Sequence, residues 1–172
     1  MEQKKPMTHF VAASVIAAVL IVYTLILQLT GLWKNPSMAW ISYLLMVAGL
    51  IIFIIQYGNA LNNRVTFGNL FSYGFKTTAL LALIMIAFTI ILFLIFPDIK
   101  QKMVETARQR MEERNTPDDQ IEKGIEMWQK MFWVFTIGGI ILVYAIVGAI
   151  GSLIGAAVTK KKPVNPLDQM SM

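Results

Sequence analysis

Uncharged, largely apolar segments alternate with short polar ones along this 172-residue chain. No Asp, Glu, Lys or Arg falls within residues 6–33, 35–63, 77–97 or 131–159. Each window is long enough to cross a hydrocarbon layer of about 30 Å, which takes roughly 20 helical residues. The windows are continuous rather than alternating, and lipid admits only helices or closed barrels. The pattern therefore predicts four membrane-spanning helices, over about residues 8–29, 37–57, 77–96 and 131–158.

A very short link joins the first two spans. Gly31, Asn35 and Pro36 are turn residues within it. Trp33 and Trp40 flank the turn, as aromatic side chains do where a helix meets the membrane surface. We therefore expect spans one and two to form an antiparallel helical hairpin.

A second amphipathic pattern precedes span three. Its apolar positions, Phe67, Leu70, Phe71, Gly74 and Phe75, recur at i, i+3, i+4, i+7 and i+8. Thr66 stands where it can cap the first turn. This spacing predicts a short interfacial helix over 66–76 that turns into span three, with Phe67, Phe71 and Phe75 as an interfacial elbow. The alternative is a lipid or partner groove lined by these phenylalanines.

The segment over 98–130 is the only sizeable hydrophilic region and holds 15 of the 25 charged residues. Ile99, Met103, Ala107 and Met111 form a weak stripe that predicts a helix after Pro97. A second helix is expected to start with Thr116 as N-cap and Pro117 at the first helical position. Nothing but a glycine interrupts it before span four, so it would run on to Val158 if unbroken.

These elements define an all-α fold. The chain is expected to be a single membrane domain over 1–172, an integral membrane four-helix bundle with a charged extramembrane helical hairpin between spans three and four. The first apolar window is too long for a cleaved secretory signal, so it is expected to stay in the protein.

Four spans put both termini on one side of the membrane. Lys4 and Lys5 precede the first span, and Lys160, Lys161 and Lys162 follow the last. A count of lysine and arginine on each side does not decide the orientation, because it gives seven on the side of the termini and eight on the other. The tail lysines are clustered, however, whereas bases of the hairpin are interleaved with acids, so the positive-inside rule favours cytoplasmic termini.

The composition of the chain argues against several kinds of functional site. The chain has no cysteine and a single histidine, His9, which excludes metal sites built from these ligands. The spans contain no Asp, Glu, Lys or Arg, which argues against proton-coupled transport. The hairpin carries seven bases and eight acids, so it does not fit a nucleic-acid surface. Its adjacent carboxylates, Glu112 with Glu113 and Asp118 with Asp119, would point apart on a helix. We expect no cofactor, no metal and no enzymatic activity.

Span four contains a run of small residues. Gly148, Gly151, Ser152 and Gly155 are spaced to let another helix backbone approach closely. No strand precedes this run and no Lys-Ser or Lys-Thr follows it, so it is not a nucleotide loop. Span one offers a matching face in Ala13 and Ala17. We expect these residues to pack helices within the monomer; the alternative is a homodimer seam.

Several of these stretches together resemble a known family. They are Val65-Thr66-Phe67-Gly68, Gly74-Phe75-Lys76, Phe96-Pro97-Asp98, the Asp-Gln-Ile-Glu stretch at 119–122, and the glycine-rich run over 151–157. Across nearly the whole chain they resemble domain-of-unknown-function family 4199. The resemblance implies a small, multi-pass inner-membrane protein of Gram-negative bacteria. It implies no catalytic residues.

Three functions fit these observations to different degrees. The first is a non-enzymatic interaction or accessory protein, sitting in the lipid bilayer, whose hairpin over 98–130 docks a membrane protein partner or a second copy. The second is a component of a small-solute transporter or channel, with polar residues such as Gln28 and Gln56 lining a path. A lipid-modifying enzyme comes third, because no acid, base or metal constellation supports it.

Overall fold

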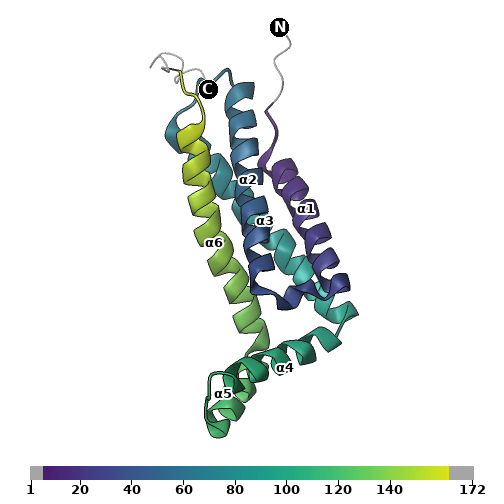
Figure 1. The fold of residues 1–172 in the computed structure, drawn as a ribbon. Coiled ribbons are helices and arrows are strands. Elements are labelled where there is room, and N and C mark those ends of the chain that lie inside the picture. The colour runs from purple at the N-terminus through teal and green to yellow at the C-terminus, as the bar shows by residue number, and fades with distance from the viewer. Residues whose placement is uncertain (1–5, 163–172) are drawn as a thin grey trace. The chain divides into compact units, whose positions relative to one another are not determined.

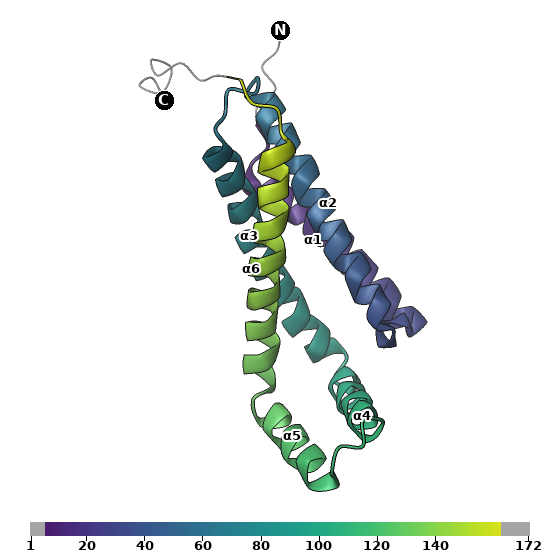
Figure 2. The ribbon, with the colours of Figure 1, turned by 60° about the vertical axis from the view of Figure 1, so that its left-hand side comes forward.

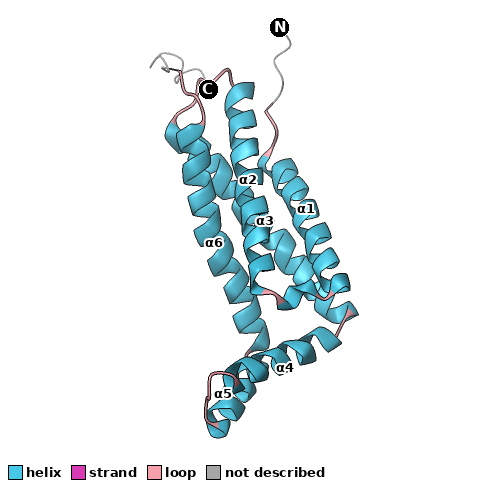
Figure 3. Ribbon diagram, in the orientation of Figure 1, coloured by secondary structure: helices cyan, strands magenta, loops and turns pink. Residues whose placement is uncertain are grey.

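The computed structural model describes residues 6–162, apart from the side chains of Lys34 and Pro36. Helices make up all the regular structure of these residues (Figure 3), which confirms the predicted all-α class. In chain order they are α1 (His9–Thr30), a 3₁₀ turn η1 (Leu32–Lys34), α2 (Pro36–Ala60), α3 (Phe67–Ile95), α4 (Asp98–Glu112), α5 (Asp118–Lys130) and α6 (Phe132–Val158) (Figure 1). Lys4 and Lys5 of the predicted cytoplasmic tail lie outside the described residues.

Four of these helices, α1, α2, α3 and α6, are long and apolar enough to cross a membrane. At most 28% of the most apolar stretch of any of them is buried inside the protein. Large apolar side chains instead point outward; Leu29 is 84% exposed and Leu94 is 72% exposed. Apolar surface on this scale marks a lipid-facing protein. The chain is therefore a membrane protein.

Helix α3 differs from the sequence prediction. The Asn69 amide donates a hydrogen bond to Thr66 Oγ1 at 3.1 Å, so Thr66 does cap the first turn. The helix then continues without interruption past Lys76, where the prediction placed the boundary between an interfacial helix over 66–76 and span three. No proline or turn residue separates the two segments, so one continuous helix covers both. Of its 29 residues, roughly 20 suffice to span the hydrocarbon layer.

A second difference concerns the helix that would run from Pro117 to Val158 if unbroken. It is interrupted at Met131, whose φ of −106° and ψ of 20° end α5 one residue before α6 begins. Ile121 and Ile125 are buried, so α5 folds against α4 instead of continuing as one straight helix with α6. Its start also differs, because Pro117 is the N-cap, and no side chain caps the first turn.

Asparagines end two of the helices. After α2, Asn62 takes a left-handed φ of 56°, and the amide of Asn63 donates to the carbonyl of Gly58 at 2.8 Å. After α4, Asn115 has a φ of 55°, and the amide of Thr116 donates to the carbonyl of Met111 at 3.1 Å. This hydrogen-bond pattern is the Schellman motif, which satisfies carbonyls left over at a helix end. Asparagine tolerates the left-handed conformation better than other residues with a side chain.

The chain packs as two compact units. Unit 1 contains described residues 6–84 and 143–162, and unit 2 contains residues 85–142. Unit 1 therefore holds α1, α2, the first part of α3 and the last part of α6. Unit 2 holds the remainder of α3 and α6 together with α4 and α5. Within unit 1, α1 and α2 contact each other as an antiparallel pair (Figure 2), as predicted.

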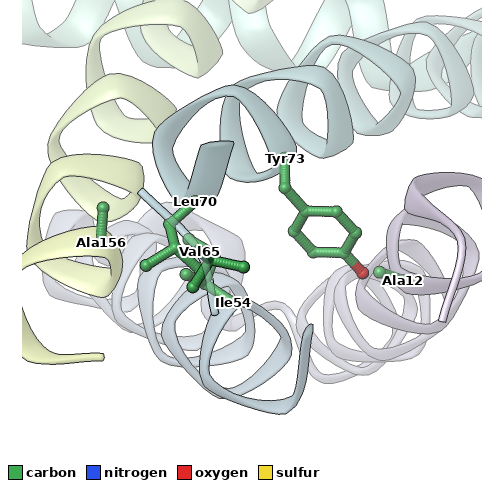
Figure 4. Packing of buried hydrophobic residues seen from close by; sticks show 6 residues of the cluster. All are labelled: Ala12, Ile54, Val65, Leu70, Tyr73 and Ala156. Atoms are coloured by element: carbon green, nitrogen blue, oxygen red, sulfur yellow. The ribbon is translucent and has the colours of Figure 1, made fainter. Parts of the chain in front are cut away.

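The core of unit 1 draws on all four of its helices. It contains Ala12 of α1, Ile54 of α2, Leu70 and Tyr73 of α3, and Ala156 of α6, with Val65 before α3 (Figure 4). At the contact between α1 and α2, a Cβ built on Gly49 would lie 3.0 Å from Cγ1 of Ile16. Unit 1 thus consists of helices that approach closely through small and branched residues.

Candidate functional site

The α4–α5 hairpin of unit 2 has a small core of its own. Ile99 of α4 and Ile121 and Ile125 of α5 are buried, as is Phe132 at the start of α6. A Cβ built on Gly124 would make an ordinary contact with Cε of Met111, at 3.7 Å. The hairpin is therefore an ordered element rather than an extended loop. Of the predicted stripe on α4, Ile99 is buried, while Met103, Ala107 and Met111 are half-buried.

Charged side chains cover the outside of the hairpin. All 15 are exposed except Lys100, which is half-buried and holds its Nζ 4.8 Å from the centroid of the Phe132 ring. Asp119 and Lys123 form an exposed ion pair, with 3.7 Å between Oδ2 and Nζ. Such an exposed pair adds little to stability. The charges are therefore available at the surface, with both signs interleaved.

A polar concavity lies between the two helices of the hairpin. It has a volume of about 480 Å³ and is lined by Lys100, Gln101, Val104 and Glu105 of α4 and by Gln129 of α5. Its lining offers hydrogen-bond donors and acceptors, and it carries one positive and one negative charge, on Lys100 and Glu105. This surface can accept polar side chains of another protein.

Aromatic rings gather where the hairpin joins the spans. The ring centroid of Phe132 lies 4.9 Å from that of Phe93 and 4.9 Å from that of Trp128. Trp133 completes the cluster, 5.9 Å from Phe93. Tryptophan concentrates at the boundary between membrane and water. This cluster was not predicted from the sequence, although Trp128 and Trp133 on either side of the start of span four indicate an aromatic anchor at the membrane surface.

The predicted helix-packing residues of α6 meet α2 and α3. A Cβ built on Gly151 would lie 3.1 Å from Cδ1 of Leu50, and one on Gly155 would lie 2.6 Å from Cδ1 of Ile54. One on Gly148 would overlap the side chain of Thr78 on α3, at 2.6 Å from Oγ1. We call this contact, with Ser152, the glycine seam.

The partner expected for this face was α1, with Ala13 and Ala17. Both alanines are buried. The nearest atoms to the three glycines nevertheless belong to α2 and α3, whose branched side chains fill the space that the missing side chains leave. The small-residue pattern identified the close-packed face but not the helix opposite it.

The phenylalanines of the predicted elbow lie on the first turns of α3. Phe67 and Phe75 are exposed, and Phe71 packs against the core of unit 1. The rings of Phe71 and Phe75 are stacked with centroids 5.8 Å apart. The Nζ of Lys161 lies 5.6 Å from the centroid of Phe67. This arrangement presents apolar rings beside a cation, as at a membrane surface.

Polar side chains within the spans bond mostly to their own helices. The hydroxyls of Thr24, Thr77, Thr78 and Thr89 each donate to the carbonyl four residues earlier, at 2.7 to 3.0 Å. Tyr23 instead donates to the carbonyl of Met38 on α2, at 3.0 Å. These bonds match the structural role predicted for them. These five hydroxyls therefore have hydrogen-bond partners within the protein.

Residues 6–162 contain no group of three or more His, Asp or Glu side chains that could hold a metal ion. The adjacent acids Glu112 and Glu113, and Asp118 and Asp119, are all exposed. The chemistry of the hairpin is that of a charged protein surface.

Comparison with known proteins gives a family but no activity. A family model described as Protein of unknown function (DUF4199) matches residues 11–161. The match covers all four candidate spans except the first residues of α1, and it includes the whole hairpin. Neither the curated proteins nor the solved structures contain a match to the chain.

Proposed function

Because the chain belongs to the DUF4199 family of proteins of unknown function, we propose a role from its geometry. The protein is a non-enzymatic, multi-pass protein of the bacterial inner membrane, and its α4–α5 hairpin docks a protein partner. The observation that carries the proposal is the hairpin itself. It is an ordered pair of helices, not needed for spanning, whose apolar residues are buried and whose charges of both signs face outward.

The charge pattern favours a protein as the occupant. Interleaved acids and bases give no field of one sign that would hold a membrane surface or a nucleic acid. They can instead complement a matching pattern on a partner, which sets orientation and excludes wrong partners. The concavity between Lys100 and Gln129 adds a shaped polar recess to this surface. A membrane protein with its own extramembrane region, or a second copy of this chain, supplies such a pattern.

The proposed location is the inner membrane, with the hairpin outside the cytoplasm. Described residues of unit 1 contain no acid, and five of its six bases, Arg64, Lys76, Lys160, Lys161 and Lys162, lie at one end, whereas the sixth, Lys34, lies in the turn between α1 and α2. At the end with the five bases, α2 terminates, α3 begins and α6 terminates, and the amide of Lys162 donates to the carbonyl of Asn63 at 2.8 Å. We call this the basic end. Lysine and arginine near the ends of spans favour the cytoplasmic face.

Site-specific photo-crosslinking tests the docking proposal. A photoreactive amino acid is placed at Lys123, which is exposed on α5, and separately at Leu44, a matched control that is 67% exposed on the apolar surface of α2. Irradiation in native membranes is expected to give a protein adduct of discrete mass from position 123 and lipid adducts from position 44. Lipid adducts alone from both positions would contradict the proposal. Co-expression of two differently tagged copies distinguishes a second copy of this chain from another protein.

A further inference from the structure

A polar pocket lies in unit 1, where α1 begins, α2 ends and α3 begins. It has a volume of about 300 Å³. Its lining residues come from these three helices: His9, Tyr57, Asn69, Ser72, Tyr73 and Lys76. Side chains that can donate hydrogen bonds make up the whole set. The pocket is thus unlike the rest of the helical surface of unit 1, which is apolar.

Tyr73 is the buried member of the set. It is 4% exposed, and its ring stacks on that of Tyr57 with centroids 4.1 Å apart. The ring of His9 meets it edge-on at 5.8 Å. Figure 4 shows the side chain extending from α3 toward Ala12 of α1. Its hydroxyl is buried and has no hydrogen-bond partner among the described residues. Buried polar atoms usually have a hydrogen-bond partner, and this hydroxyl beside the pocket is an exception.

The surrounding charge is of one sign. Lys76 lines the pocket, which opens at the basic end, and no acid occurs in residues 6–84 or 143–162. Roughly 20 residues of α3 counted back from Ile95 cross the hydrocarbon layer, which places Lys76 at about the depth of the lipid phosphates. Exposed Phe67 and Phe75 lie on the same part of α3. Basic pockets between membrane-spanning helices are typical binding sites for anionic lipid headgroups.

We infer that this pocket binds the phosphate of an anionic phospholipid. Lys76 supplies the cation, and the exposed Asn69 and half-buried Ser72 supply uncharged donors. The exposed Phe75, next to Lys76 in the sequence, favours a lipid over a soluble phosphate, because it gives the acyl chains an apolar surface next to the headgroup. The pocket accommodates the phosphate and the adjoining part of the headgroup, while the chains stay in the bilayer. This binding is independent of any partner at the hairpin.

Native mass spectrometry of the full chain tests the inference. The protein is released from nanodiscs that contain equal amounts of phosphatidylglycerol and phosphatidylcholine, and the bound lipids are counted. We expect phosphatidylglycerol to be retained preferentially. Lys76→Gln should reduce this preference roughly tenfold, the loss typical of one charge-assisted hydrogen bond. Asn69→Ala, which removes an uncharged donor, should reduce it less. Both side chains are exposed, so the helix packing is retained.

Lys160→Gln is the matched control, because Lys160 is an exposed base of the same end that does not line the pocket. It should leave the preference nearly unchanged. An equal loss in Lys160→Gln and Lys76→Gln would show a diffuse basic surface and overturn the inference. Equal retention of the two lipids by the unaltered protein would also overturn it. Millimolar inorganic phosphate that displaces phosphatidylglycerol from the detergent-solubilised protein would assign the pocket to a soluble anion instead.

Discussion

The glycine seam of unit 1 and the α4–α5 hairpin of unit 2 hold helices together by different physical means. In the seam, the absence of side chains at Gly148, Gly151 and Gly155 lets α6 approach α2 and α3 closely. In the hairpin, Ile121 and Ile125 are buried while charged residues face outward. Lipid is as apolar as the helices, so close packing must supply the attraction there. In the hairpin, which water surrounds, the hydrophobic effect drives the burial of apolar side chains. The two regions should therefore respond to opposite changes, lost volume in one and added volume in the other.

The largest effect is expected in the hairpin. Ile121 is 1% exposed, so Ile121→Ala should leave a cavity and lower the local free energy of unfolding by about 3 kcal/mol. Hydrogen exchange should rise across α4 and α5 and stay unchanged in the α1–α2 pair. Met127→Ala is the control, because that side chain is 56% exposed on the same helix. Equal exchange in both variants would show that the buried isoleucines do not hold the hairpin together.

The seam should respond to added volume. A methyl group at Gly148 would overlap Thr78, so Gly148→Ala should destabilise the protein by about 1 to 3 kcal/mol. Steric trapping in bicelles measures this free energy of unfolding. Gly138→Ala on the same helix is the control, because no other side chain lies within 4 Å of a Cβ built there. That variant should be neutral or more stable by up to about 1 kcal/mol. If the two variants behave alike, close approach at Gly148 does not matter.

Ser152 gives a smaller effect of opposite sign. Its hydroxyl is buried in the seam and has no hydrogen-bond partner among the described residues. Ser152→Ala removes that polar group with almost no loss of volume, so it should stabilise the protein by about 1 kcal/mol. The same unfolding measurement checks it. A loss of stability would mean that the hydroxyl has a partner in the membrane, such as a bound water.

The smallest effect is expected at the hairpin surface. Lys123→Ala breaks the exposed ion pair with Asp119 and should change the free energy of unfolding by less than about 0.5 kcal/mol. The difference should vanish at 1 M salt, where screening is strong. A larger change that persists in high salt would mean that Lys123 has a structural contact besides Asp119.

Charge placement was enough to predict most of this architecture. Residues without charge mark α1, α2, α6 and the part of α3 after Lys76, and the charged segment marks the hairpin, because ionisable groups avoid lipid strongly enough to override other preferences. The end of α1 at Gly31 and the start of α2 at Asn35 were also predictable, because each depends on the residue at that position. Gly31 takes a left-handed φ of 73°, and Asn35 caps α2.

Features that depend on distant residues were not predictable in this way. The break at Met131 has no turn residue of its own and follows from the packing of α5 on α4. The small residues of α6 showed a close contact, but only the structure places Leu50, Ile54 and Thr78 against it. The polar pocket joins His9, Tyr57 and Lys76, which are far apart in the sequence. Such juxtapositions carry no local signal.

The central claim is that the hairpin, and not the spans, carries the interaction with other proteins. The most direct test replaces residues 100–126 with a flexible Gly/Ser linker of the same length and identifies the proteins that co-purify from native membranes. The account expects the discrete partner to disappear while membrane insertion and the stability of the α1–α2 pair are unchanged. Retention of the same partner by a correctly inserted variant would contradict it.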